Sequence, residues 1–375
     1  MVHQATTDCT PEQAAYNPDV LERIDKYFLN CIDKGITQGA IYMMSRGGKV
    51  FAHRSMGKLR PDTLPGTLLP DAIRPAASIT KVFTATAILQ LIEQGKCFLW
   101  NPAALFIPEL DNPMHHHILI QHLLTHTSGL SGDAGNYFEP FPIFDWLSWT
   151  KENWIRKALA GPLAAKPGTQ WRYSSSGFSI LAEIIARISK MDYDDYVTEK
   201  ILKPLKMDSS FFYCPEHLKD KFCIVGSDMN QWAVNKSKAN SPSPSVLGGG
   251  GLSTNVKDLH QLGLMMLSKG TLNNKRILGR KTVEAATRAQ IKNIISYCWQ
   301  PHIYDDSYPV DYGLGWELQK NSFMSPGTFG HEGAEGAALH IDPREEFVFT
   351  AFYPDKNYHR ETWVHTLPMV WSGLK

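Results

Sequence analysis

Strand-like segments stand at both ends of this chain, and a long helical and loop-rich stretch separates them. Residues 39–44 and 49–54 flank Gly47-Gly48, a pattern typical of a β-hairpin. The other strand-like runs lie near the far end, at residues 313–318, 327–330, 337–341 and 347–352. Strands from both ends can pair within one layer, so the sequence predicts a single, largely antiparallel sheet.

Helical spacing of apolar residues dominates the rest of the chain. A strongly apolar run at 81–94 ends at Gly95 and follows a proline-rich connection at 61–75. The pattern predicts other helices at 19–34, 118–125, 149–160, 176–189, 193–201, 256–267 and 360–372, and an exposed polar loop at 228–245.

This order of segments predicts an α/β (α+β) protein that forms a single unit over residues 1–375. Residues 1–80 and 246–375 would form a sheet-containing lobe, and residues 81–245 a mainly helical lobe. A functional site is expected in a cleft between the lobes.

Composition excludes several classes of function. Lys and Arg number 38 against 37 Asp and Glu, and the net charge of +1 gives no basic footprint for nucleic acid. No apolar run approaches the ~18 residues that span a membrane, and no signal peptide precedes the first helix, so we expect a cytoplasmic protein without a membrane partner. The six cysteines lie far apart without a CxxC pair, and this spacing favours buried free thiols over a disulfide framework. The oligomeric state stays open.

Ser78-Ile79-Thr80-Lys81 places a hydroxyl and an amine one helical turn apart at the start of the apolar helix. Positions i and i+3 share a helix face, so the lysine can reach the serine oxygen. Serine is a poor nucleophile until a base takes its proton, and burial or nearby positive charge lowers a lysine pKa toward that role. The same spacing also occurs on solvated helix faces, so it needs support from elsewhere in the chain.

Two further segments can complete a site around Ser78. The first, Tyr173-Ser174-Ser175-Ser176-Gly177, stands at a loop-to-helix junction, where a phenol near a lysine can act as general acid or base. The second, Gly330-His331-Glu332-Gly333-Ala334, lies in the strand-rich tail, where glycines admit a substrate and leave an N–H free for an oxyanion. Each segment also has an interpretation without a functional role. The first can be a core tyrosine followed by helix-capping serines, and the second a glycine-containing turn with a surface histidine.

In this order the segments resemble the serine β-lactamase and penicillin-binding-protein superfamily, whose members carry S-x-x-K, Tyr-x-Asn or a variant, and Lys/His-x-Gly. The chain is similar to the branch of class C β-lactamases, family VIII carboxylesterases and related acyltransferases. Other strings of that branch follow in family order at residues 75–81, 122–130, 167–168, 173–174, 250–254 and 312–316. The resemblance covers about residues 18–370. It implies a β-lactamase/transpeptidase-like fold, an antiparallel sheet flanked by helices with a helical insertion lobe.

The resemblance also implies a role for each matched residue. Ser78 is the nucleophile that becomes acylated, and Lys81 and Tyr173 form the pair that handles its proton. The backbone N–H groups of Ser78 and Ala334 make the oxyanion hole. Substrate-binding positions are Ser175, His331, Glu332 and Gly333, and His331 replaces the lysine that opens the third motif of true β-lactamases.

Two departures from the family pattern favour esters over β-lactams. Ser175 stands where many relatives have asparagine, and its shorter side chain with one donor weakens recognition of a substrate amide. His331-Glu332-Gly333 replaces Lys-Thr-Gly, which favours a substrate carboxylate by charge and hydrogen bonding. A glutamate facing the cleft opposes such a carboxylate, although strand alternation can also point Glu332 away.

The sequence therefore predicts a serine hydrolase that acts on small-molecule esters through a covalent acyl-enzyme, as carboxylesterases do, without a cofactor. Three alternatives stay open: acyl transfer to a small alcohol or amine, β-lactamase or D-Ala peptidase activity, and a non-enzymatic scaffold subunit of the same fold. Aromatic residues of the insertion form either an acyl-binding wall or packing under a loop: Tyr137, Phe138, Phe141, Phe144, Trp146 and Trp149.

His122 and His126 raise a competing metal hypothesis. Their i, i+4 spacing suits zinc on a helix, and His115-His116-His117 lie nearby. However, no glutamate follows His122 directly, no distant carboxylate ligand is evident, and the family string accounts for both histidines as packing residues. We therefore expect no metal site.

Overall fold

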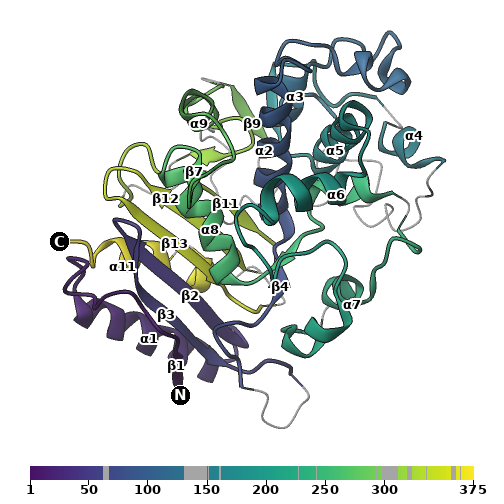
Figure 1. The fold of residues 1–375 in the computed structure, drawn as a ribbon. Helices are drawn as coiled ribbons and strands as arrows, with labels where there is room; N and C mark the ends of the chain where they lie inside the picture. Colours follow the sequence, from purple (N-terminus) through teal and green to yellow (C-terminus); the bar gives the residue numbers. More distant parts are fainter. Residues whose placement is uncertain are drawn as a thin grey trace.

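The computed structural model describes residues 1–375 except 62–66, 131–149, 151, 160–161, 227, 242, 292–293, 298–310, 319–322, 335, 356–359 and 364. A sheet-bearing part lies beside a part built mainly of helices (Figure 1). Among the helices so described, none combines the length and apolar character needed to cross a membrane. The lobe boundaries near residues 80 and 245 stay a prediction.

Seven strands of the described chain form one antiparallel sheet. Their order is β1 (Val2–Gln4), β3 (Lys49–Gly57), β2 (Gly39–Arg46), β13 (Phe347–Phe352), β12 (Ala337–Asp342), β11 (Phe329–Gly333) and β10 (Glu317–Leu318). β2 pairs with β13, so the two ends of the chain meet in the middle of the sheet. This pairing confirms the predicted sheet, and β1, which the sequence pattern did not reveal, adds an edge strand.

Helices cover both faces of the sheet (Figure 1). α1 (Pro18–Asp33) and α11 (Thr366–Trp371) share one apolar core with the sheet, which includes Phe28, Tyr42 and Trp371. α8 (Val256–Leu267) packs on the other face. There a Cβ on Gly263 would lie 2.6 Å from Val348 Cγ1, so the glycine lets the helix lie close against β13.

α2 (Thr80–Glu93) lies deep in the molecule, and all of its residues from Thr80 to Leu89 are buried. Because a helix buried on all sides has no face in water, its polar side chains must find partners inside the protein. Thr84 is an example, since its hydroxyl lies 2.7 Å from both Tyr193 Oη and the Gly248 carbonyl oxygen. The start of α2 is therefore a place where polar groups are held in fixed positions.

The remaining elements are shorter, apart from one long helix. They are α3 (Ile120–Leu124), α4 (Trp154–Ala158), α5 (Ser175–Ser189), α6 (Tyr193–Val197), α7 (Asp228–Asn235), α9 (Arg280–Ala286) and α10 (Arg360–Trp363). Short strands pair as β4 (Arg74–Pro75) with β6 (Ser253–Thr254), β5 (Gln170–Arg172) with β9 (Ile295–Tyr297), and β7 (Thr271–Leu272) with β8 (Lys275–Arg276).

The prediction of an exposed loop over residues 228–245 is wrong, because that stretch contains α7 and enters a 3₁₀ turn at Pro244–Gly249. Ala233 of α7 is buried in a small apolar cluster with Ile73, Phe211 and Phe222. All three partners precede α7 in the chain, and Ile73 is far from it in sequence, so the local sequence does not show these contacts. Tertiary contact therefore orders a segment whose own composition is polar.

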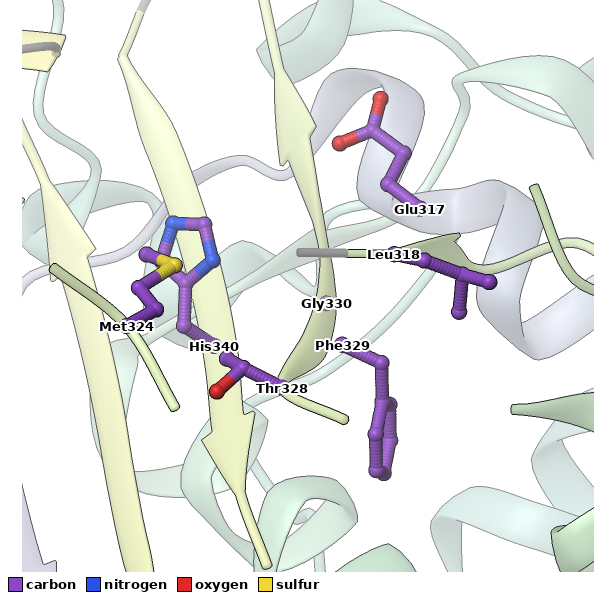
Figure 2. A pocket seen from close by; sticks show the side chains of 7 residues that line it. All are labelled: Glu317, Leu318, Met324, Thr328, Phe329, Gly330 and His340. Atoms are coloured by element: carbon purple, nitrogen blue, oxygen red, sulfur yellow. The ribbon is translucent and has the colours of Figure 1, made fainter. Parts of the chain in front are cut away.

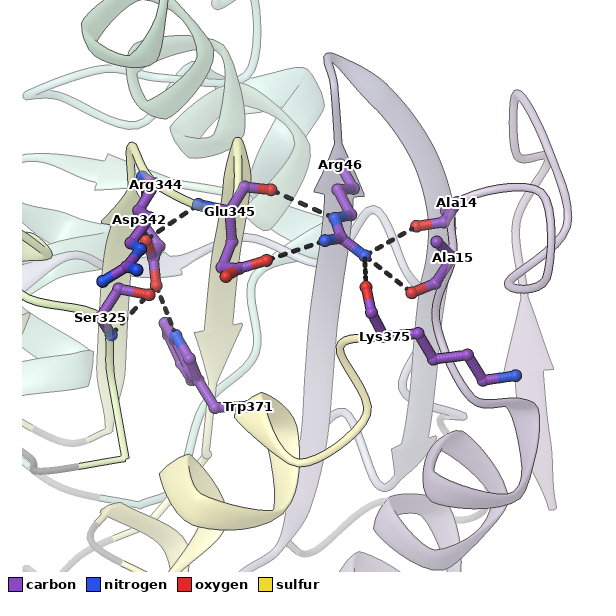
Figure 3. A network of polar contacts seen from close by, with 9 residues as sticks. All are labelled: Ala14, Ala15, Arg46, Ser325, Asp342, Arg344, Glu345, Trp371 and Lys375. Atoms are coloured by element: carbon purple, nitrogen blue, oxygen red, sulfur yellow. Dashed lines mark hydrogen bonds and ion pairs between the residues drawn. The ribbon is translucent and has the colours of Figure 1, made fainter.

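Asp342, at the end of β12, ties the C-terminal helix to the sheet (Figure 3). Its Oδ2 accepts hydrogen bonds from Trp371 Nε1 at 2.8 Å and from the Ser325 N–H at 3.3 Å. Its Oδ1 accepts from the N–H groups of Arg344 and Glu345 at 3.1 and 3.2 Å. The Asp342 carboxylate is fully buried, so no water molecule is at hand to accept from these donors if the carboxylate is removed.

Replacing Asp342 with alanine should destabilise the protein. Asp342→Ala leaves buried donors without an acceptor, and we expect the free energy of unfolding to fall by about 2–4 kcal/mol. Chemical denaturation followed by circular dichroism measures the change. Glu22→Ala is the matched control, because Glu22 is 69% exposed in its ion pair with Lys26. Equal unfolding midpoints for the two variants would contradict the assignment.

Candidate active site

Ser78 lies at the junction of a 3₁₀ turn (Ala77–Ile79) and α2, and its side chain is partly exposed. Ala77 has a left-handed φ of 45°, a conformation that is costly for a residue with a side chain. The Thr80 hydroxyl holds the turn, since it donates to the Ala77 carbonyl at 2.7 Å and accepts from the Leu252 N–H at 3.0 Å. The serine is therefore presented on a fixed turn at a helix N-terminus.

Lys81 follows one turn later, and its side chain is completely buried. Its Nζ donates to three oxygens: Ser78 Oγ at 3.0 Å, Ser175 Oγ at 2.8 Å and the Gly249 carbonyl at 2.7 Å. An ammonium group has three N–H donors, so these acceptors match its full capacity. The i, i+3 spacing read from the sequence does bring the amine to the serine oxygen.

Tyr173 lies against the lysine, between β5 and the start of α5. Lys81 Nζ is 4.6 Å from the centroid of the Tyr173 ring, a distance at which an ammonium and an aromatic face attract. Tyr173 is buried, and Ser174 caps α5 by accepting the Gly177 N–H at 3.3 Å. The structure thus gathers the nucleophile, the lysine and the phenol predicted from sequence.

Gly249 is a member of this group that the sequence analysis did not single out. A Cβ on Gly249 would lie 2.7 Å from the Ser175 carbonyl oxygen and 2.9 Å from Ser175 Cβ. Glycine is therefore required for the chain to pass α5 closely enough to offer its carbonyl to Lys81. The run of four glycines at 248–251 was the available signal, because such runs mark close backbone approach.

His331 is fully buried on β11 and faces Tyr173, with 6.3 Å between the ring centroids. Its Nδ1 is 2.6 Å from the Glu332 carbonyl oxygen, which can only accept, so Nδ1 carries a hydrogen. Its Nε2 lies 3.2 Å from Tyr312 Oη and 3.9 Å from Glu317 Oε1. His331 therefore forms part of the wall around Tyr173, and Tyr312 is a second neighbour that sequence reasoning did not assign.

The end of β11 passes directly against the nucleophile segment. A Cβ on Gly333 would lie 2.2 Å from the Ala76 carbonyl oxygen, two residues before Ser78. Ala334 follows at once and is partly exposed. This close approach is what an oxyanion hole from the Ser78 and Ala334 amides requires, and the hole itself stays a prediction.

Glu332 does not join the Ser78 group. Its Oε1 lies 3.5 Å from Nε2 of His340, whose ring packs against Phe349 and Trp371 on the other face of the sheet. Strand alternation, with His331 toward Tyr173, accounts for this orientation. The expected contact between Glu332 and a substrate at Ser78 is therefore not supported, and the argument that its charge repels a carboxylate loses its basis.

A small hollow opens near this second face (Figure 2). It is lined by Glu317, Leu318, Met324, Thr328, Phe329, Gly330 and His340. None of the lining residues belongs to the Ser78–Lys81–Tyr173 group, so the hollow is separate from the nucleophile. The aromatic residues from Tyr137 to Trp149, expected as an acyl-binding wall or loop packing, lie outside the described residues.

The two histidines of the metal hypothesis are each occupied by a backbone amide. His122 Nδ1 accepts the Leu119 N–H at 3.2 Å, and His126 Nδ1 accepts the Ser174 N–H at 3.0 Å. In the described chain, one cluster has three possible metal ligands, Asp192, Asp194 and Asp195. Lys238 Nζ lies 3.5, 3.0 and 3.0 Å from their carboxylates and offsets part of their charge.

Comparison with known proteins identifies the family of the chain. The sequence profile of the Beta-lactamase family matches residues 24–361. The chain belongs to the beta-lactamase family. Members of this family are serine hydrolases and acyltransferases.

Two relatives match this chain over different shares of their length. Protein flp of Staphylococcus aureus (strain N315) is 30% identical over 215 residues, 56% of this chain and 42% of that protein. The chain thus spans less than half the length of that relative. The D-alanyl-D-alanine-carboxypeptidase/endopeptidase AmpH of Escherichia coli (strain K12) is 25% identical over 361 residues, 95% of this chain and 85% of that protein.

Solved structures show the shared β-lactamase/transpeptidase-like fold. EstCE1, described as a hydrolase with promiscuous acyltransferase activity, superposes with a TM-score of 0.77 at 17% identity, covering 97% of this chain and 99% of that one. A class C beta-lactamase gives 0.75 at 17% identity, with 95% and 97% covered. A mutant simvastatin synthase from Aspergillus terreus gives 0.76 at 17%, with 95% and 96% covered. The predicted fold class is confirmed.

The position of the Gly249 carbonyl can be tested by a matched pair of substitutions. Gly249→Ala forces the chain away from Ser175, so we expect labelling of Ser78 by a fluorophosphonate probe to slow by about 10- to 100-fold. Intact mass spectrometry over time measures the rate. In Gly250→Ala the new Cβ would come no closer than 3.8 Å to any atom beyond its chain neighbours, an ordinary contact. Equal labelling rates for the two variants would show that the carbonyl does not hold Lys81.

Proposed function

We propose that this protein is a serine hydrolase that cleaves carboxylic esters through a covalent acyl-enzyme on Ser78. The observation that carries the proposal is the 3.0 Å hydrogen bond between Lys81 Nζ and Ser78 Oγ, with the same Nζ 4.6 Å from the centre of the Tyr173 ring. A nucleophile, a proton acceptor and a positive charge are thereby held together at a partly exposed serine.

In the proposed acylation, Ser78 Oγ forms a bond to the ester carbonyl carbon while its proton passes to the Tyr173–Lys81 pair. The charge that develops on the carbonyl oxygen is stabilised by the Ser78 and Ala334 N–H groups. The carbon–oxygen bond to the alcohol then breaks, and the pair returns the proton to that alcohol as it leaves. In the second half, water attacks the acyl carbon with the pair again as base, which frees the acid and restores Ser78.

The surroundings of the nucleophile support an ester rather than a β-lactam. The residue in the position of the third-motif lysine is His331, and its two ring nitrogens already face the Glu332 carbonyl and Tyr312. Ser175 uses its oxygen to accept from Lys81, so less of it is available for a substrate amide. Both features weaken the recognition of the carboxylate and side-chain amide that β-lactams carry.

Transfer to an acceptor other than water is a second candidate, because EstCE1 combines hydrolysis with acyltransferase activity and has the same fold. Activity on β-lactams or D-alanyl peptides is another alternative, because the relative AmpH is named a D-alanyl-D-alanine-carboxypeptidase/endopeptidase. A scaffold without catalysis is disfavoured by the complete set of hydrogen bonds around Lys81, since a scaffold gains nothing from burying an amine beside a serine.

The nucleophile is tested with p-nitrophenyl butyrate. We expect wild-type protein to hydrolyse it and Ser78→Ala to lose more than about 10³-fold in rate, because the covalent step has no substitute. Rapid quenching and intact mass analysis should detect one butyryl group on the wild type and none on the variant. Ser189→Ala, at the far end of α5, is the control and should keep full rate. Butyryl on Ser78→Ala, or no ester hydrolysis by the wild type, would contradict the proposal.

Substrate class is tested with an acyl-donor panel that includes nitrocefin, measured with and without added alcohols and amines. We expect esters to exceed nitrocefin in kcat/KM by at least about 100-fold, equivalent to roughly 2.7 kcal/mol in transition-state binding. Product analysis separates free acid from transferred acyl groups. Nitrocefin turnover equal to that of the best ester would overturn the ester assignment while leaving the Ser78 acyl-enzyme intact.

A further inference from the structure

We infer that His126, which the mechanism above does not use, is a positioning residue that fixes Tyr173 beside Lys81. The inference rests on the proposed function, because it assigns a purpose to His126 only if Tyr173 handles the Ser78 proton. It is carried by hydrogen bonds on both sides of Tyr173 and by ring packing against it.

His126 holds the backbone on either side of Tyr173. Its carbonyl oxygen accepts the Arg172 N–H at 2.7 Å, and its ring Nδ1 accepts the Ser174 N–H at 3.0 Å. One residue thus engages the amides directly before and after the phenol. Since two fixed points define the path of the short segment between them, the Cα of Tyr173 has little freedom to move.

The His126 ring also restrains the side chain. Its centroid lies 4.3 Å from that of the Tyr173 ring, with 30° between the planes. Phe178 at 5.0 Å and Tyr312 at 5.1 Å enclose the imidazole from other sides. His126 is 1% exposed, so the contact excludes water and the phenol ring cannot tilt without displacing it.

The hydrogen bond to Ser174 requires a neutral imidazole. An amide N–H can only donate, so Nδ1 must be without its hydrogen and the remaining proton sits on Nε2. Burial, and then the charges of Lys81 and His331, lower the pKa of His126 well below its usual value. The Nε2 atom has no hydrogen-bond partner in the described part of the chain, so its contribution lies in packing.

His126 adopts a left-handed φ of 56°, a conformation that is uncommon for residues with a side chain, although asparagine, aspartate and histidine adopt it more often than the others. This conformation lets the carbonyl and the ring of the same residue both reach the Tyr173 segment. Backbone strain at a residue that grips a reactive group is a pattern found at functional sites.

Two substitutions separate the acceptor from the ring. His126→Phe keeps an aromatic ring but removes the acceptor for the Ser174 N–H, and we expect kcat on p-nitrophenyl butyrate to fall about 10- to 100-fold with KM within about threefold. His126→Asn places an oxygen near the position of Nδ1 and tolerates the left-handed φ, so it should recover at least about tenfold of that loss.

His122→Phe and His122→Asn are matched controls. His122 is four residues earlier, and its Nδ1 likewise accepts a backbone amide, but that of Leu119 rather than of the Tyr173 segment. Both should keep kcat within about twofold of wild type. Melting temperatures of all variants, together with the pH dependence of kcat, distinguish loss of folded protein from loss of Tyr173 placement, because only the latter moves the pH profile.

The outcomes are distinct. Active wild type with His126→Phe equal to His122→Phe overturns the inference and leaves the proposed function standing. The same holds if His126→Phe loses rate only in proportion to its folded fraction, or if His126→Asn is no better than His126→Phe. Wild type that forms no acyl-enzyme on any ester overturns both, since no proton transfer through Tyr173 then exists to be organised.

Discussion

The structure depends on the burial of one amine. Lys81 has no exposed surface, and a buried ammonium is very costly unless each of its donors is satisfied. The three acceptors come from the turn before α2, from the first residue of α5 and from Gly249, the last residue of the 3₁₀ turn at Pro244–Gly249. Segments that are far apart in the chain must therefore converge at one nitrogen, and this requirement accounts for the glycines and small hydroxyl side chains that surround it.

The sheet supplies the other half of the site. Because β2 pairs with β13, the C-terminal strands are anchored to the N-terminal hairpin, and β11 is carried to the segment before Ser78. Gly333 then lies so close to the Ala76 carbonyl that any side chain would clash. The oxyanion hole that we propose is thus a meeting of sheet and helix, and its geometry depends on the register of the whole sheet rather than on a local motif.

Several parts of this arrangement could be predicted from the sequence, and others could not. The i, i+3 spacing of Ser78 and Lys81 is local, so helix geometry alone predicts their contact, and the structure has it at 3.0 Å. The orientation of Glu332 depends on strand phase, which a one-residue difference reverses, and both orientations were open in the sequence. The helix at Asp228–Asn235 was missed because its order comes from the apolar contacts of Ala233 with distant residues.

The amino-acid sequence by itself predicted Ser78 as a nucleophile with Lys81 and Tyr173 as its partners, because each stands in a short segment whose residue types suit that chemistry, and helix geometry alone determined the contact between Ser78 and Lys81. It also predicted the antiparallel sheet, because strand-like runs at the two ends can pair within one layer. Only the tertiary structure decided how these parts act together: that the Gly249 carbonyl completes the shell of Lys81, that His331 faces Tyr173 while Glu332 faces away, and that His126 holds the residues on both sides of Tyr173. These contacts join residues that are distant along the chain, and the sequence alone does not show which distant residues will come together.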